Sequence, residues 1–157
     1  MIRVLFVCLG NICRSPMAEA VFRDLVQRNG LQHKIEVDSA GTGNWHVGNP
    51  PHDGTLTLLE QKGIAAEGMT ARQIVREDGE TFDYILAMDS QNLRDLRKVI
   101  KEKNGVFVGR FLDLVENAPS KDVPDPYFTG NFEEVYDLVL RGCHALLERI
   151  KREKKLA

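Results

Sequence analysis

Short β-branched apolar runs and longer segments with a helical period alternate along this chain. Residues 2–7 are apolar almost throughout and predict a buried central strand. Further strands are predicted at residues 34–39, at residues 84–88 and around residues 106–108. Because helical segments separate these strands, the pattern predicts an α/β fold with a parallel sheet.

The helical segments carry start and stop signals. Ser15 as N-cap and Pro16 in the first turn predict a helix that ends before Gly30. An extended, stiff loop is predicted at residues 120–130, which contain two prolines. Three further helices are predicted: one that ends at Gly63, one that starts at Asp89 or Ser90, and one with Asn131 as N-cap. The last of these has an apolar stripe of Val135, Val139, Cys143, Leu146 and Ile150.

Composition narrows the class of protein. A chain of 157 residues with 43% hydrophobic and 28% charged residues predicts one globular domain over residues 1–157. The net charge of −2 argues against nucleic acid as the main partner, and the apolar run at residues 4–9 is too short for a membrane span or a secretory signal. Three cysteines, at 8, 13 and 143, argue against a disulfide scaffold and for a reducing cytoplasm.

The segment after the first strand has the arrangement of an anion site. A strand, a tight loop with Gly10 and Asn11, and a helix start follow one another, and both loop residues tolerate left-handed backbone angles. In such a loop the free backbone N–H groups converge on one point, and the helix dipole adds positive potential. The sequence therefore predicts an oxyanion site at residues 8–15.

Two side chains in this loop suggest chemistry as well as binding. Arg14 would hold two phosphate oxygens with its guanidinium. The same positive field would favour the thiolate of Cys8, which attacks phosphorus, and the Ser15 hydroxyl could donate to that sulfur. Without the strand-loop-helix context, Cys8 would be read as an ordinary buried cysteine. A zinc site lacks a second ligand pair at usable spacing, so no metal is predicted.

Residues 7–16 resemble the signature loop of the low-molecular-weight protein tyrosine phosphatases. The resemblance extends in order to residues 39–42, 48–51, 71–73, 82–89 and 125–127, and so covers essentially the whole chain. It implies a four-stranded, twisted parallel sheet with helices on both faces. It also implies a two-step reaction without metal or cofactor, in which Cys8 forms a phosphocysteine that water hydrolyses.

The resemblance assigns roles to further residues. Asp125 matches the family's general acid and base, although an Asp before Pro is by itself more often a turn residue; Asp122 is the weaker candidate. Asp89 is expected to cap a helix, with a supporting role at the site as its second function. The expected phosphate loop comprises Leu9, Gly10, Asn11, Ile12, Cys13 and Ser15, with Ser39 and Asn11 holding its shape, and Trp45 and Tyr127 are expected to be the walls of the substrate cleft. For Trp45 alone, a position over the edge of the core is predicted as strongly as a position in the wall of the cleft.

The remaining cysteines and one departure complete the family comparison. Cys13 could form a reversible disulfide with Cys8 that prevents over-oxidation, whereas Cys143 fits the core. Met69 stands where some members of the family carry His, which puts the wider hydrogen-bond network in question.

The resemblance predicts phosphotyrosine-bearing proteins as substrates, phosphate-like oxyanions as inhibitors, and a monomer. A protein-arginine phosphatase is the main alternative; its members typically carry Thr where this chain has Ile12. Arsenate reductase activity would need resolving cysteines on a mobile segment. The sequence contains only Cys143 for this role, on a predicted helix, which argues against that activity. A non-catalytic phosphoprotein-binding module would not need both Cys8 and Asp125.

Overall fold

Residues 1–156 are described by a computed structural model, which contains one sheet of four strands. All three strand pairs are parallel, and the strand order is β2-β1-β3-β4. The predicted α/β fold with a four-stranded parallel sheet is thus confirmed. The strands are β1 (Ile2–Cys8), β2 (Ile35–Gly41), β3 (Tyr84–Ala87) and β4 (Phe107–Arg110).

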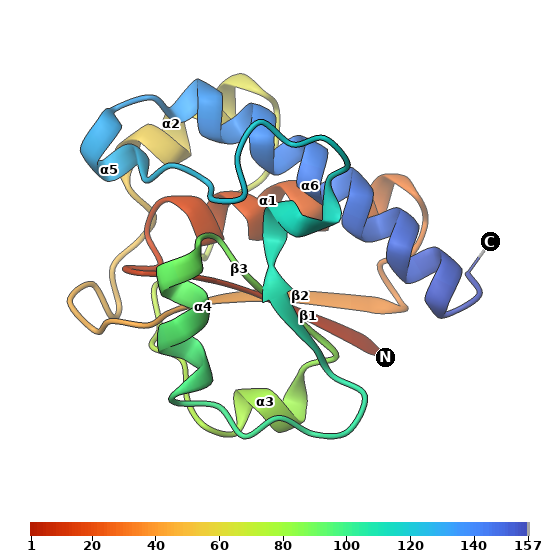
Figure 1. Ribbon diagram of the computed structural model, residues 1–157. Coiled ribbons are helices and arrows are strands. Elements are labelled where there is room, and N and C mark those ends of the chain that lie inside the picture. The colour runs from red at the N-terminus through yellow and green to blue at the C-terminus, as the bar shows by residue number, and fades with distance from the viewer. Residues whose placement is uncertain (157) are drawn as a thin grey trace.

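Helices cover both faces of the sheet, as expected. Figure 1 shows α1, α2 and α6 on one face and α3 and α4 on the other. The helices are α1 (Arg14–Arg28), α2 (Asp53–Gln61), α3 (Asp78–Thr81), α4 (Ser90–Arg97), α5 (Pro126–Thr129) and α6 (Phe132–Glu153), with a 3-10 turn at Phe111–Leu114. Within residues 1–156, no helix is both long and apolar enough to cross a membrane.

The apolar residues of β1 supply both halves of the core, because successive side chains of a strand point to opposite faces. Phe6 points toward α1 and α6, where its ring packs edge-on against Phe22 and Phe111 at centroid distances of 5.8 and 5.5 Å. Leu5 and Val7 point to the other face, in one cluster with Leu96 of α4. Burial on both sides explains why β1 reads as a continuous apolar run.

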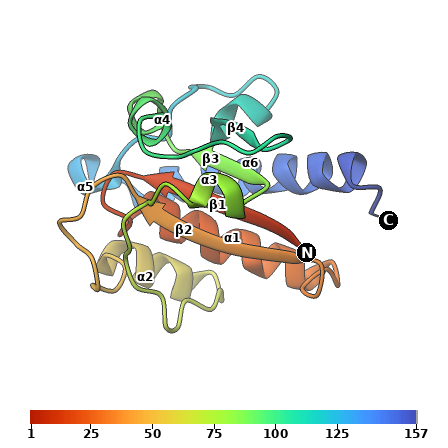
Figure 2. The ribbon, with the colours of Figure 1, turned by 90° about the horizontal axis from the view of Figure 1, so that it is seen from below.

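The strand order places a crevice at one end of the sheet. After β1 the chain passes through α1 to β2 on one side, and β3 then lies on the other side of β1. In parallel α/β sheets, ligands bind at such a reversal, beyond the carboxyl ends of the strands. Figure 2 shows α5 at the end toward which β2 points, so that end holds both the loop after β1 and the segment around α5.

Several element boundaries differ from the sequence-based prediction. Helix α1 begins at Arg14, and its N-cap, Cys13, makes no side-chain capping bond. Ser15 was therefore wrongly predicted as the cap, because its hydroxyl lies against the Cys8 sulfur instead. The 120–130 loop is not extended throughout, since it contains the short helix α5 with Asp125 as N-cap. Asn131 does cap α6, by accepting from the Glu134 N–H at 3.1 Å.

Candidate active site

Residues 8–15 curl from the end of β1 into the first turn of α1. The curl requires one left-handed residue, and Asn11 supplies it with φ 57°. Gly10 is not left-handed; it leaves room instead, because a Cβ there would lie 3.0 Å from Cδ2 of His46. Gly41, at the end of β2, likewise leaves room for the loop, since its Cβ would lie 2.8 Å from the Leu9 carbonyl oxygen.

The loop presents backbone N–H groups to a single cavity. Within residues 1–156, the N–H groups of Leu9, Gly10, Ile12 and Cys13 have no hydrogen-bond acceptor, and all four residues line the cavity. Since buried or half-buried N–H groups are seldom left unpaired, this arrangement is suited to an oxyanion. The cavity has a volume of about 120 Å³.

Cys8 lies at the base of this cavity, nearly buried, and two groups converge on its sulfur. The Asn11 N–H donates to Sγ at 3.2 Å, and the Ser15 hydroxyl lies 2.9 Å from Sγ. The Ser15 hydroxyl also accepts from Nδ2 of Asn11 at 2.8 Å, so its own hydrogen remains for the sulfur. Both contacts therefore donate to Cys8, and both stabilise a thiolate.

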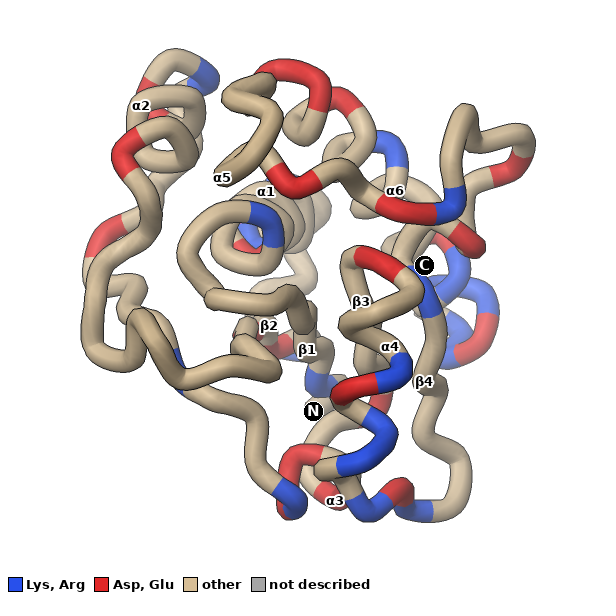
Figure 3. The backbone as a smooth tube through the Cα atoms, turned by 60° about the vertical axis from the view of Figure 1, so that its left-hand side comes forward, with Lys and Arg blue, Asp and Glu red and all other residues tan. Residues whose placement is uncertain are grey.

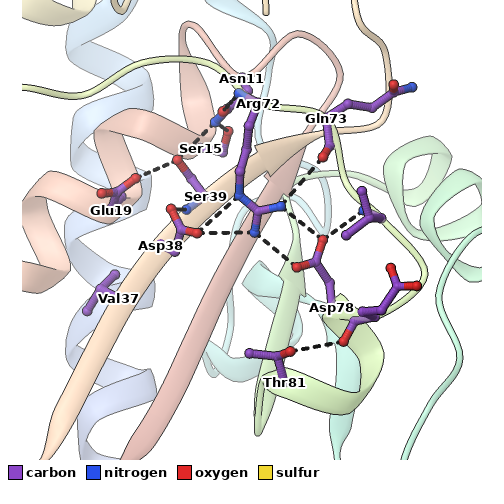
Figure 4. A network of polar contacts seen from close by, with 12 residues as sticks. Asn11, Ser15, Glu19, Val37, Asp38, Ser39, Arg72, Gln73, Asp78 and Thr81 are labelled. Carbon is purple, nitrogen blue, oxygen red and sulfur yellow. Dashed lines mark hydrogen bonds and ion pairs between the residues drawn. The ribbon is translucent and has the colours of Figure 1, made fainter. Parts of the chain in front are cut away.

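The orientation of the Asn11 amide is fixed by its other neighbours (Figure 4). The Arg72 N–H can only donate, so the atom of Asn11 that faces it at 3.0 Å must be the oxygen. The amide nitrogen then donates to Ser15 and, at 2.9 Å, to Ser39. Ser39 in turn donates to the buried carboxylate of Glu19 at 2.6 Å. In this series of hydrogen bonds, from the Arg72 N–H to the Glu19 carboxylate, every donor is matched to an acceptor.

A cluster of charges holds Arg72 in place. Its guanidinium contacts Asp78 at 3.0 and 3.1 Å and Asp38 at 3.1 Å, and Figure 4 shows it lying between the two carboxylates. Burial opposes the charge on Arg72, but the two carboxylates outweigh it and raise the pKa of Arg72. Glu19 is paired separately, with Arg23 on the next turn of α1. The hydrogen-bond network from Asn11 to Glu19 is thus complete with Met at position 69.

Arg14 is buried, and three acceptors surround its guanidinium. It contacts Asp89 at 2.6 Å, the Val123 carbonyl oxygen at 3.0 Å and Asp125 at 3.4 Å. Burial alone would lower the pKa of Arg14, but its interactions with Cys8, Asp89 and Asp125 raise it. Asp89 has a second contact as N-cap of α4, which matches its predicted capping role.

The predicted acid reaches the same cavity from the segment before α6. Asp125 lines the cavity and caps α5 by accepting from the Tyr127 N–H at 3.1 Å. Asp122, the weaker candidate, does not line the cavity; its carboxylate bonds to Ser90. The structure thus brings Asp125 to the loop that carries Cys8 and Arg14, although the two segments are more than 100 residues apart in the sequence.

Aromatic side chains form the rim. Trp45 and Tyr127 line the cavity while exposing 68% and 55% of their surface, so Trp45 is a rim residue and not a cover of the core. Sequence reasoning missed two further rim residues, His46 and Phe128. Figure 3 shows that charged residues gather around α3 and α4, and the segment 39–52 that contributes Trp45 contains no Lys, Arg, Asp or Glu.

The other two cysteines differ in their surroundings. Cys13 lines the cavity, and burial, Asp125 and Cys8 together raise its pKa to about 12. Cys143 is fully buried in the main apolar cluster, as predicted, and burial raises its pKa as well. Ile12 exposes 8% of its surface at the cavity wall and packs with Cys13 and Ala71.

Comparison with known proteins agrees with this architecture. The family model of the low molecular weight phosphotyrosine protein phosphatases matches residues 3–156. The chain belongs to this family. It is 57% identical to the low molecular weight protein-tyrosine-phosphatase YfkJ of Bacillus subtilis, over 99% of this chain and 100% of that protein, and 44% identical to PtpA of Staphylococcus aureus, over 99% and 98%.

Solved structures give the same result. The crystal structure of YfkJ superposes with a TM-score of 0.94, covering 98% of this chain and 97% of that chain. The structure of DARP, a Drosophila arginine phosphatase, is 34% identical and superposes with a TM-score of 0.85, covering 94% of this chain and 97% of that one.

Proposed function

We propose that this chain hydrolyses phosphotyrosine in proteins, with Cys8 as nucleophile, Arg14 as phosphate ligand and Asp125 as general acid and base. The observation that carries the proposal is the surroundings of the Cys8 sulfur. Two donors face it, and the unpaired N–H groups of the loop surround the space in front of it. A buried structural cysteine needs neither feature.

The first step transfers the phosphoryl group to sulfur. The Cys8 thiolate attacks phosphorus, the bond between phosphorus and the phenolic oxygen breaks, and protonated Asp125 gives its proton to the leaving phenolate. Arg14 and the loop N–H groups bind the non-bridging oxygens, on which charge develops. The Ser15 hydroxyl holds the thiolate in the resting enzyme.

The second step releases phosphate. A water molecule attacks the phosphocysteine, Asp125 takes a proton from that water, and the bond between phosphorus and Cys8 sulfur breaks. The Asn11 N–H and the Ser15 hydroxyl stabilise the sulfur as it leaves. The cycle returns the enzyme with a thiolate at Cys8 and a proton on Asp125.

The rim supports an aromatic substrate. Trp45, Tyr127 and Phe128 offer flat apolar surfaces beside the phosphate-binding loop, suited to the ring of a phosphotyrosine. Ile12 places an apolar side chain in the cavity wall, where a Thr hydroxyl would favour phosphoarginine. Because the chain is also structurally similar to an arginine phosphatase, phosphoarginine is the substrate to compare with phosphotyrosine.

An aryl phosphatase assay on the wild type and three variants tests the catalytic roles. Cys8→Ser is expected to abolish turnover, and Asp125→Asn to lower it by about 10²- to 10³-fold while leaving vanadate binding intact. Asp137→Ala, an exposed carboxylate on α6, is the control and is expected to match the wild type. Activity that survives in Cys8→Ser would contradict the proposal.

A second assay tests the substrate class. The wild type and Ile12→Thr are compared on a phosphotyrosine peptide and a phosphoarginine peptide of the same sequence. The wild type is expected to prefer phosphotyrosine, and Ile12→Thr to shift the ratio of the two kcat/KM values toward phosphoarginine. A wild-type preference for phosphoarginine would overturn the assignment of substrate.

A further inference from the structure

The segment that carries Asp125 is tied to the start of α4 by a different carboxylate. Oδ1 of Asp122 accepts from the Ser90 N–H at 2.9 Å and from the Ser90 hydroxyl at 2.8 Å. The Ser90 hydroxyl accepts in turn from Arg110 at 3.1 Å, so its own hydrogen is directed to Asp122. These contacts join three segments of the chain at one point.

The backbone around Asp122 is held just as closely. The Ser120 hydroxyl accepts from the Asp122 N–H at 3.1 Å and donates to the Asp122 carbonyl oxygen at 2.9 Å, which closes a tight turn. The next residue, Val123, is 1% exposed, and its N–H donates to the Met88 carbonyl oxygen at 2.8 Å. The Asp122 carboxylate thus anchors a segment whose backbone is also held, at Asp122 and at Val123.

Little flexibility separates this anchor from the acid. Asp125 is two residues beyond Val123, between Pro124 and Pro126, whose rings fix φ and restrict the residue before each of them. The Val123 carbonyl oxygen also accepts from Arg14. A displacement at Asp122 is therefore passed on to Asp125 relative to the phosphate-binding Arg14, with few rotations available to absorb it.

We propose that Asp122 is a positioning residue that holds Asp125 at the leaving-group oxygen, acting through Ser90 at the start of α4. The proposal rests on the role of Asp125 proposed above. Asp122 is not part of the cavity wall, so its effect is on proton transfer and not on phosphate binding. Misplacing a catalytic group by an ångström can cost up to about 10²-fold in rate.

The dependence of the rate on the leaving group distinguishes this role from a general effect on the fold. Because kcat/KM covers the step that expels the leaving group, it is measured with phenyl phosphate, whose phenolate leaves poorly, and with 2,4-dinitrophenyl phosphate, which needs no acid. Asp122→Ala is expected to lower kcat/KM about tenfold for phenyl phosphate and less than twofold for the activated ester. An equal loss for both esters, or no loss, would overturn the proposal.

Conservative variants keep the proposal testable should Asp122→Ala fail to fold. Asp122→Asn retains Oδ1 as an acceptor for both Ser90 groups and is expected to restore most of the rate with phenyl phosphate. Ser90→Ala removes one of the two bonds and is expected to show a smaller loss of the same selectivity. Full activity of Ser90→Ala with phenyl phosphate would count against the proposal. Asp137→Ala is the matched control, with no change for either ester.

A double mutant distinguishes the positioning role of Asp122 from the proposed role of Asp125 as general acid. If Asp125 is the acid, Asp125→Asn alone lowers kcat/KM for phenyl phosphate far more than for 2,4-dinitrophenyl phosphate. An equal fold loss with the two esters would refute the role of Asp125. If Asp122 acts through Asp125, adding Asp122→Ala to Asp125→Asn causes no further loss for phenyl phosphate. An additional tenfold loss would show that Asp122 acts by another route.

Discussion

The Arg72 N–H donates to Oδ1 of Asn11 at 3.0 Å, although the two residues are 61 positions apart in the sequence. This bond determines which end of the Asn11 amide faces Ser15. It thereby makes the Ser15 hydroxyl a donor to the Cys8 sulfur. The hydrogen bonds to the Cys8 sulfur are therefore linked to a segment that lies outside the loop of residues 8–15.

Asn11 is the residue at which this link can be tested. Asn11→Ala removes three side-chain hydrogen bonds, while its φ of 57° is unfavourable for Ala. We expect a loss of about 3 kcal/mol in the free energy of unfolding and a fall in kcat of at least tenfold. Urea denaturation and an aryl phosphatase assay measure the two effects.

Asn11→Gly is the matched variant, because Gly lacks the side chain but accepts the left-handed backbone. Its stability is expected to exceed that of Asn11→Ala by about 1 kcal/mol, with kcat just as low. If kcat recovers in Asn11→Gly, backbone strain and not the amide network accounts for the loss.

Cys13 is predicted to protect Cys8 from irreversible oxidation. Peroxide converts the Cys8 thiolate to a sulfenic acid, which condenses with the Cys13 thiol to a disulfide and releases water. Wild-type activity is therefore expected to return after peroxide treatment and reduction by a dithiol, whereas Cys13→Ala stays inactive. Cys143→Ala is the control and should recover like the wild type; full recovery of Cys13→Ala would refute the prediction.

The high pKa of Cys13 makes a further prediction about the same reaction. With a pKa of about 12 the thiol is almost wholly protonated near neutral pH, and the thiolate is the nucleophile. The rate of disulfide formation after oxidation is therefore expected to rise by close to tenfold for each unit increase of pH in the mildly alkaline range. Stopped peroxide reactions analysed by mass spectrometry of the disulfide would show it.

Asp83 is expected to contribute to stability in a pH-dependent way. Burial opposes its charge, but the Arg3 N–H and Lys103, each at 2.9 Å, outweigh this and hold the pKa of Asp83 below its ordinary 3.8. The contribution is therefore present above pH 3.8 and is lost as the pH falls through the lower, folded-state pKa.

Urea denaturation across this acid range measures the effect. The difference in free energy of unfolding between the wild type and Asp83→Asn is expected to shrink as the pH falls below 3.8. Glu116→Gln, an exposed carboxylate without an ion pair among residues 1–156, serves as control and should show a constant difference. A constant difference for Asp83→Asn as well would contradict the prediction.

Gly142 in the middle of α6 allows the helix to approach Phe111. A Cβ at this position would lie 2.2 Å from the buried Phe111 ring. Ala would gain about 1 kcal/mol in helix propensity, but overpacking of a core costs about 1–3 kcal/mol, and a clash this close lies at the upper end. Gly142→Ala is therefore expected to lower the free energy of unfolding by about 1–2 kcal/mol, measured in urea, whereas the exposed Arg141→Ala changes it little.

The sequence by itself determined the architecture and the chemical centre. The apolar runs of the strands and the helical periods between them are local properties, so the parallel α/β fold follows from residues close together in the chain. The loop around Cys8 and Arg14 is equally local, because a strand, a curl and a helix start lie within a few residues of one another. Asp125 needed more than local information, and the family resemblance supplied it.

Only the tertiary structure decided what surrounds these groups. The start of α1 moved to Arg14 because the Ser15 hydroxyl is bound to Cys8, a contact that no capping pattern contains. Glu19 and Asp78 gave no signal as isolated charges, and the resemblance at residues 71–73 assigned no role to Arg72. Only the contact with Ser90 distinguishes Asp122 from a second candidate acid. Such roles depend on which distant segments the parallel sheet brings to the carboxyl ends of its strands, and side-chain periodicity carries no information about those pairings.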